Sequence, residues 1–211
     1  MQAARLNSRR AGAKVLSALG ASGEIMTGLI ILGIVVVVIV VAVYLYNDLV
    51  KKRQLVAEGW SGIDVQLKRR ADLIPNMLET VKGYMAHERE TLEAVTAARA
   101  SAMNAANATP EERARAEGAL SGALGRMFAV AESYPDLKAN TNFLEFQDTL
   151  RTIEDEVQLS RRYYNGAVRN LNTAVESVPS NIIANAFRFE TAEYFELDDE
   201  ADRAVPHVKF S

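Results

Sequence analysis

The sequence predicts an all-α protein, in which an N-terminal transmembrane helix is followed by an antiparallel bundle of long helices. Residues 26–46 are apolar and carry no charge. Beyond them, apolar residues recur at spacings of three, four and seven, the pattern of helices that bury one face. The same region is rich in alanine, leucine, glutamate and arginine, which favour helices over strands.

The composition excludes several classes of site. The chain has no cysteine and 2 histidines, so disulfides and thiolate zinc sites are impossible and little remains for metal ligation. The net charge of -3 argues against nucleic acid as a partner. His87 and Glu88 do not form an HExxH motif, because Thr91 stands where the second histidine is needed. We therefore predict a protein that is not an enzyme, with no cofactor and no metal site.

Residues 1–25 form a basic leader, which we predict to be unfolded. At about 1.5 Å per residue, a helix over residues 26–46 spans about 30 Å, the thickness of the hydrocarbon core of a bilayer. This apolar run exceeds the 7–15 residues typical of a signal peptide, and no small-residue cleavage pattern follows it. An uncleaved anchor is therefore the favoured interpretation, and Met26 is an alternative start of translation.

The charges that flank the span give only a weak indication of the side of the membrane on which the bundle lies. Four basic residues precede the span, and Lys51, Lys52 and Arg53 follow it, so the positive-inside rule gives a near tie. Translation from Met26 would break the tie and place the bundle in the cytoplasm. We favour that orientation, with a periplasmic bundle as the alternative.

Residues 47–189 are predicted to form the bundle. Its first helix carries an apolar stripe from Trp60 to Val95, with a kink or break near Pro75 because proline lacks an N–H donor. The second helix, about residues 110–133, contains Gly118, Gly122 and Gly125, whose spacings of four and three would let another helix approach closely. The third repeats apolar residues every seven positions, typical of a bundle or coiled coil: Phe143, Leu150, Val157, Tyr164, Leu171 and Val178.

Charged residues within these helices have two interpretations. A solvated helix face is the simpler one. The sharper hypothesis is that Asp72 pairs across the bundle with Arg161 or Glu154, near Pro75, and so helps to fix the register between helices.

Residues 190–211 form an acidic tail, which we predict to be mobile and solvated. The alternating Val205, Val208 and Phe210 leave open a second possibility, in which the tail docks as an extended strand on a partner.

Four motifs stand in order along the chain: WSGIDVQLKRRADLIPN at residues 60–76, YPDLKAN at 134–140, RRYYN at 161–165 and PSNIIA at 179–184. Together they strongly resemble the LemA family. The resemblance implies a bacterial single-pass protein of the inner membrane with an antiparallel helical bundle. It also suggests that the ending AVPHVKFS docks, because it is similar to the family's C-terminal P-x-V-x-F element. The resemblance does not point to a particular biochemical activity.

Two functions follow from these observations. The favoured one is a membrane-anchored scaffold, in which the bundle associates with itself or holds another membrane protein. The alternative is a regulatory adaptor to a membrane protease or signalling protein. Its predicted contact is the tail or the turn that contains Tyr134, Asp136, Lys138 and Asn140.

Overall fold

The computed structural model describes residues 2–196, with side chains from residue 26 onward. The chain divides into two compact units, Met1–Asp48 and Leu49–Ser211. We refer to residues 49–196 as the bundle.

Helix α1, Gln2–Lys82, includes the apolar stretch. It begins at Gln2, so the prediction of an unfolded leader was wrong. The leader contains no proline and is rich in alanine, and such a segment extends an adjoining helix at little cost. The large apolar side chains between Met26 and Val43 are 46% to 63% exposed. Within the described part of the chain, α1 is the one helix long and apolar enough to cross a membrane.

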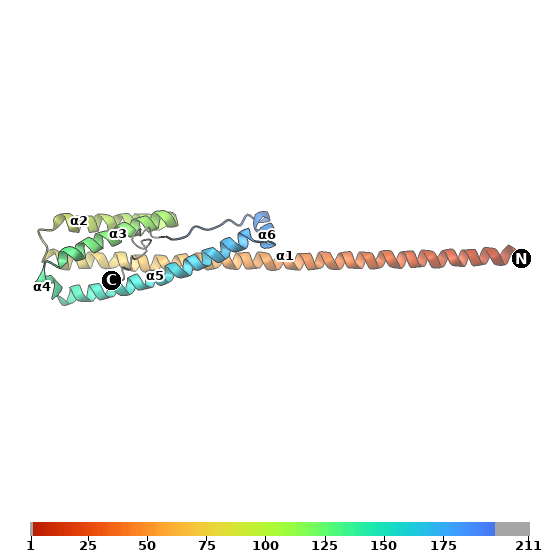
Figure 1. Cartoon of the computed structure of the whole chain (residues 1–211), viewed down its shortest axis with the longest axis horizontal. Coiled ribbons are helices and arrows are strands. Elements are labelled where there is room, and N and C mark those ends of the chain that lie inside the picture. The colour runs from red at the N-terminus through yellow and green to blue at the C-terminus, as the bar shows by residue number, and fades with distance from the viewer. Residues whose placement is uncertain (1, 197–211) are drawn as a thin grey trace, which may run out of the picture. The chain divides into compact units, whose positions relative to one another are not determined.

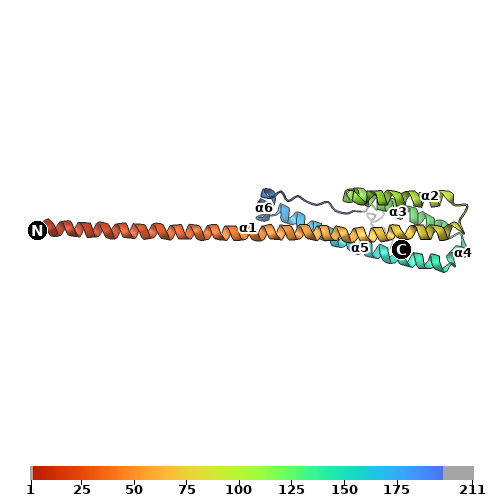
Figure 2. The same cartoon turned by 180° about the vertical axis from the view of Figure 1, so that it is seen from behind.

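The regular elements of the bundle are all helices, and the described residues include no strand. Its later elements are α2 (Arg89–Asn104), the short 3-10 helix η1 (Ala105–Asn107), α3 (Pro110–Ala131), α4 (Pro135–Lys138), α5 (Thr141–Glu176) and α6 (Ser180–Ala186). Helices α2 and α3 form an antiparallel hairpin beside α1 and α5 (Figures 1 and 2). The all-helical fold is confirmed.

The first helix of the bundle ends earlier than its apolar stripe predicted. Helix α1 stops at Lys82, and a turn over residues 83–88 leads into α2. Gly83 favours the stop, because glycine is a poor helix former. Met85 in this turn is fully buried. Its position in the sequence continues the apolar spacing of the helix, although the backbone of the turn is not helical. The interruption between Lys82 and Arg89 was therefore not predicted, since the sequence placed any break near Pro75.

Pro75 lies inside α1 and does not end it. Proline leaves the carbonyl oxygen four residues earlier without its helical N–H donor. That oxygen belongs to Ala71, and it accepts a hydrogen bond from Nε of Arg99 at 2.7 Å. The guanidinium from α2 thus replaces the missing donor, which lets α1 continue through the proline.

The starts of α3 and α5 follow from local sequence. The Thr109 hydroxyl accepts from the Glu112 N–H, and the Glu112 carboxylate accepts from the Thr109 N–H, a capping box. At α5, the Asn140 side chain accepts from the N–H of Phe143 at 3.1 Å. Helix α5 ends at Glu176, before Pro179. Val178 lies beyond this end and is 77% exposed, so its assignment to the buried seam was wrong.

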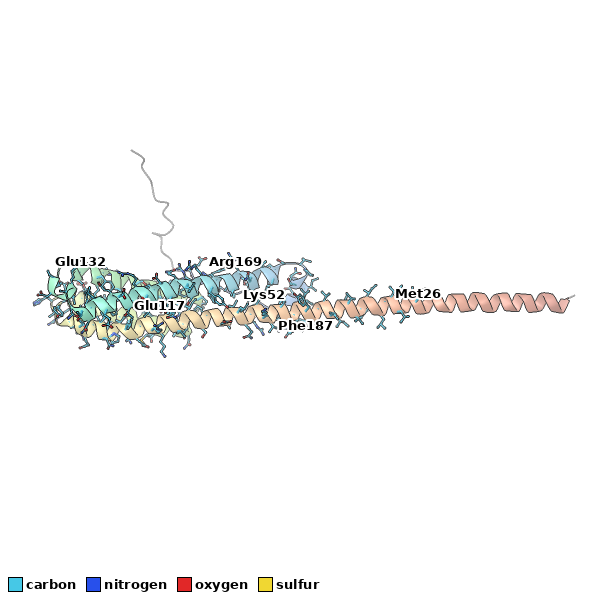
Figure 3. All side chains as sticks on the ribbon, turned by 90° about the horizontal axis from the view of Figure 1, so that it is seen from below. Met26, Lys52, Glu117, Glu132, Arg169 and Phe187 are labelled. Atoms are coloured by element: carbon cyan, nitrogen blue, oxygen red, sulfur yellow. The ribbon has the colours of Figure 1, made fainter. Side chains whose placement is uncertain are left out.

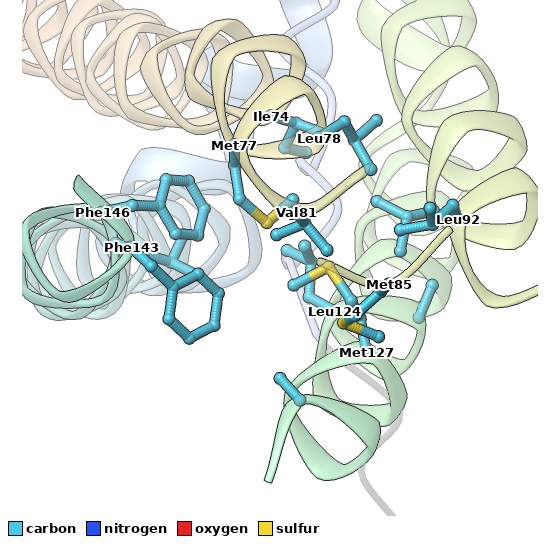
Figure 4. Packing of buried hydrophobic residues seen from close by; sticks show 14 of the residues in the cluster. Ile74, Met77, Leu78, Val81, Met85, Leu92, Leu124, Met127, Phe143 and Phe146 are labelled. Carbon is cyan, nitrogen blue, oxygen red and sulfur yellow. The ribbon is translucent and has the colours of Figure 1, made fainter. Parts of the chain in front are cut away.

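The largest apolar cluster joins α1, α2, α3 and α5 around Val81, Met85, Met127 and Phe143 (Figure 4). A second cluster contains Ile63, Val157 and Tyr164. Helices α1 and α5 approach closely at Gly59, where an added Cβ would lie 3.0 Å from Cα of Tyr164. The buried seam of α5 confirms the predicted heptads from Phe143 to Leu171.

Candidate functional site

A buried arginine links three helices at the centre of the bundle. Arg70 on α1 is 2% exposed. Its Nη1 donates to Glu154 on α5 at 2.7 Å and to the Ser121 hydroxyl on α3 at 3.0 Å. Its Nη2 forms an ion pair with Glu117 on α3, a residue labelled in Figure 3. One cation therefore holds α1, α3 and α5 together.

A second buried arginine extends this network. Arg113 on α3 pairs with Asp64 on α1 at 2.7 Å and donates to the backbone oxygen of Ala106 at 2.7 Å. Its Nε lies 4.0 Å from Glu117, so the two arginines share that carboxylate. Its guanidinium also lies over the ring of Trp60, 5.9 Å from the centroid, a cation–π distance.

Burial and charge act in opposite directions on Arg70. Burial lowers its pKa because the charged form loses hydration. The carboxylates of Glu154 and Glu117 raise it, and together with their hydrogen bonds they outweigh burial, so the pKa of Arg70 stands above its ordinary value. The guanidinium is therefore a permanent cation that the two carboxylates neutralise.

A groove of about 310 Å³ adjoins the network between α1 and the α2–α3 hairpin. Asp64, Arg113 and Glu117 reach its wall from the network. Leu67, Ala71, Ala102 and Met103 supply apolar surface. Asp64, Arg113 and Glu117 are paired with one another, so this part of the wall stabilises the fold. The other two charged residues of the wall are Lys68 and Asp72.

A different type of contact holds residues 190–196, which we call the docked segment. Asn172 on α5 donates to the Ala192 oxygen at 2.9 Å and accepts from the Ala192 N–H at 2.8 Å. Asn165 does the same for Phe195, at 3.1 Å and 2.9 Å. Each amide side chain thus pairs with one backbone residue as a neighbouring β-strand would. We call the two residues the asparagine clamp.

The docked segment is anchored by aromatic packing. Phe195 is fully buried, and its ring centroid lies 5.8 Å from that of Trp60. Tyr164 packs on Trp60 at 5.4 Å, and its hydroxyl donates to the Glu193 oxygen at 2.8 Å. Burial, with a smaller contribution from the charge of Glu193, raises the pKa of Tyr164 to about 12.

Removing the clamp is expected to release the docked segment. In the double variant Asn165→Ala, Asn172→Ala, four hydrogen bonds are lost, each worth about 1 kcal/mol. Phe195 then leaves Trp60, the single tryptophan of the chain, and its fluorescence shifts to longer wavelength as water reaches the ring. Asn170→Ala, at an exposed position on the same helix, is the matched control. An unshifted spectrum in the double variant would contradict the clamp.

The predicted residues near Pro75 are arranged differently from the hypothesis. Glu154 does pair across the bundle, but its partner is Arg70. Asp72 is exposed and takes part in no ion pair among residues 26–196, and Arg161 is half-buried. The pairing of Asp72 with Arg161 or Glu154 was therefore wrong. Pro75 lies one turn beyond Arg70, at the Arg99 contact described above.

The turn over residues 134–140 packs against the turn over residues 83–88. The Tyr134 hydroxyl donates to Glu88 at 2.9 Å, and the Asn140 amide donates to the Tyr84 hydroxyl at 3.1 Å. The Glu88 hydrogen bond, followed by burial and charge, raises the pKa of Tyr134. Lys138 pairs with Glu132, and Asp136 is exposed. Tyr134 and Asn140 thus close one end of the bundle.

The tail prediction has a divided outcome. Residues 190–196 dock on the bundle of the same chain, so the prediction of a mobile segment was wrong for them. Val205, Val208 and Phe210 lie outside the described residues.

Sequence reasoning missed Arg70, Arg113, Glu117 and the asparagine clamp. Charged residues are rarely buried, so Arg70 was not separated from its exposed neighbour Arg69. The pattern does carry a signal, because Arg70 stands seven residues after Ile63 and four before Ile74, in phase with the apolar stripe. The clamp does leave a signal. Asn165 and Asn172 lie seven residues apart, each directly after a seam residue, and asparagine is unfavourable inside a helix unless its side chain has a partner.

Comparison with known proteins shows the family to which this chain is similar. Residues 59–210 match the LemA family. Protein LemA of Metamycoplasma hominis is 27% identical over 155 residues, which cover 72% of this chain and 69% of that protein. Magnetosome protein MamQ 2 of Paramagnetospirillum magneticum is 24% identical over 184 residues, which cover 76% of this chain and 68% of that protein.

Proposed function

This chain belongs to the LemA family, and from that premise we propose that it is a membrane-anchored scaffold that associates with itself or holds another membrane protein. The assignment to the membrane rests on the exposed apolar stretch of α1 and on the family match. The scaffold role rests on the surface of the bundle.

The main support is an exposed apolar stripe on α5. Leu159 is 62% exposed and Tyr163 is 48% exposed, one helical turn apart. Gly166 follows at the next turn, and an added Cβ there would meet nothing within 4 Å. We call these three residues the α5 stripe. Helix α5 already buries a separate seam that includes Val157 and Tyr164, so the stripe is apolar surface beyond what the bundle uses.

Helix α3 offers a second surface of suitable shape. Gly118, Gly122 and Gly125 are exposed. An added Cβ would meet nothing within 4 Å at Gly118 or Gly125, and at Gly122 it would meet only Arg126 of the same helix. Glycine costs about 1 kcal/mol in a helix relative to alanine, and no close contact within the bundle accounts for these three. A helix of another protomer or protein would fit closely there.

The interior suits a scaffold as well. The ions of Arg70, Arg113, Glu117 and Glu154 are paired inside the bundle. Such pairs favour one arrangement of helices over others, because every misplaced arrangement leaves a buried charge without a partner. The bundle therefore presents its surfaces in a fixed geometry.

The test is the mass of the complex after mild solubilisation of the full chain from its membrane, with every co-purifying protein identified. A scaffold is expected to run as a homogeneous assembly larger than a monomer. The variant Leu159→Gln, Tyr163→Gln should reduce that mass. Met103→Gln, at a residue of similar exposure on α2 (48%), should leave it unchanged.

Two outcomes oppose the proposal. A monodisperse monomer with no co-purifying protein would remove the scaffold role. If the assembly has the same mass in the wild type and in the α5 double variant, the α5 stripe is not its interface. The α3 glycines would then be the next surface to test.

The alternative, a regulatory adaptor to a membrane protease or signalling protein, is favoured by one observation. The asparagine clamp binds backbone atoms, so an extended peptide of another protein can make the same hydrogen bonds. An adaptor of this type would appear as a stoichiometric second protein in the mass measurement. Its capture should change in the Asn165→Ala, Asn172→Ala variant and not in Asn170→Ala.

A further inference from the structure

Large apolar side chains gather around α6 on the surface of the bundle. Ile182 on α6 is 64% exposed, Val178 just before the helix is 77% exposed, and Phe187 just after it is 60% exposed. We call these three residues the α6 patch. Three large exposed apolar residues within ten positions of the chain are a local concentration of apolar surface, and such concentrations mark interaction sites more often than single scattered residues do.

The inner face of α6 fixes where this patch lies in the bundle. Ala184 and Phe189 pack on Leu49, and all three are buried. Leu49 stands three residues after Tyr46, the last residue of the apolar stretch. Three residues of even fully extended chain reach about 11 Å. The helix that carries the patch is therefore packed on a residue tied directly to the end of the membrane span.

Basic residues stand close in the sequence to the residues that pack together here. Lys51, Arg53 and Arg188 are exposed, and the Arg53 guanidinium lies 5.1 Å from the ring centroid of Phe189. Lys52 and Phe187 are labelled at this end of the bundle in Figure 3. Apolar side chains rimmed by lysine and arginine are typical of helices that lie in a membrane interface. Basic residues close to an anionic membrane surface add electrostatic attraction.

From these observations we infer that α6 is a second membrane contact, and that the α6 patch enters the headgroup region of the bilayer in which the chain is anchored. The span supplies the anchor, and α6 adds a fixed point of contact beside it. Lys51, Arg53 and Arg188 bind the phosphates of anionic lipids. Interfacial helices of this kind bury their apolar face about 5–10 Å below the surface, a depth within reach of residues tied so closely to Tyr46.

The test uses the absence of cysteine in the chain. Ile182→Cys is labelled with an environment-sensitive fluorophore in the full chain, which is reconstituted into vesicles that contain brominated lipid. Leu144→Cys, on α5 at the other end of the bundle and 49% exposed, is the matched control. The label at position 182 is expected to be quenched several-fold more strongly than the label at 144. Circular dichroism checks that both variants keep their helices.

A second measurement tests the role of the basic residues. Quenching at position 182 is expected to be stronger in vesicles with anionic lipid than in vesicles with neutral lipid, and Arg188→Gln should reduce that difference. Equal quenching at 182 and 144 would overturn the inference. So would efficient disulfide cross-linking of Ile182→Cys chains to one another with no quenching by lipid, because a second copy of the chain would then cover the patch.

Discussion

Replacing Arg70 by methionine is expected to lower the free energy of unfolding by about 3–5 kcal/mol, the usual effect of removing one partner of a buried ion pair. The cause is the carboxylate left behind. Glu117 has a side chain that is 4% exposed, and its remaining cation is Arg113 at 4.0 Å. Denaturant unfolding of the full chain in detergent, followed by circular dichroism, measures the change.

The control lies one residue earlier. Arg69 pairs with Glu156 at 2.7 Å, and the two side chains are 53% and 40% exposed. An exposed pair contributes about 0–1 kcal/mol, so Arg69→Met should change stability little. The double variant Arg70→Met, Glu117→Leu should recover much of the loss, because it also removes the unpaired charge. Equal effects of the Arg69 and Arg70 variants would contradict the role assigned to Arg70.

Gly59→Ala is expected to destabilise the bundle by about 1–3 kcal/mol, the cost of forcing extra atoms into a packed interface. The added Cβ would lie 3.0 Å from Cα of Tyr164, and a backbone atom in a helix does not yield easily. This cost opposes the gain of about 0.5–1 kcal/mol that alanine normally brings over glycine inside a helix.

Gly62, one turn later on the same helix, predicts the opposite sign. An added Cβ there would meet Oγ of Ser160 at 4.0 Å, an ordinary contact. Gly62→Ala should therefore raise the melting temperature while Gly59→Ala lowers it. If both variants were more stable than the wild type, the close approach of α1 and α5 at Gly59 would be wrong.

The sequence predicts the helices well where their signals are local. The heptads of α5 and the Thr109 cap of α3 depend on neighbouring residues, and both elements form as expected. The break considered at Pro75 does not occur, because the missing donor is replaced by Arg99, which is distant in sequence. The turn at Gly83 was missed because Met85 keeps the apolar spacing while the backbone leaves the helix.

Long-range pairing explains most of the remaining differences. Glu154 was identified as a residue that pairs across the bundle, but its partner was assigned to Asp72 or Arg161 and not to Arg70. Residues 69, 70 and 72 are all charged. The spacing from Ile63 and Ile74 places residue 70 on the buried face, but its acidic partner on α3 is distant in sequence and could not be predicted. The docked segment was read as a solvated tail because it is acidic, whereas its contacts use backbone atoms and Phe195.

The asparagine clamp also limits how this region can evolve. Asn172 follows Asn165 by seven positions of helix, a rise of about 10.5 Å, and Phe195 follows Ala192 by three positions of extended chain, about 10 Å. The two lengths match, so both hydrogen-bond pairs form together. Substitutions at Glu193 or Tyr194, both exposed, leave this match intact. Insertion or deletion of one residue between positions 192 and 195 breaks it, so the length of this segment is more constrained than the identity of its two exposed residues.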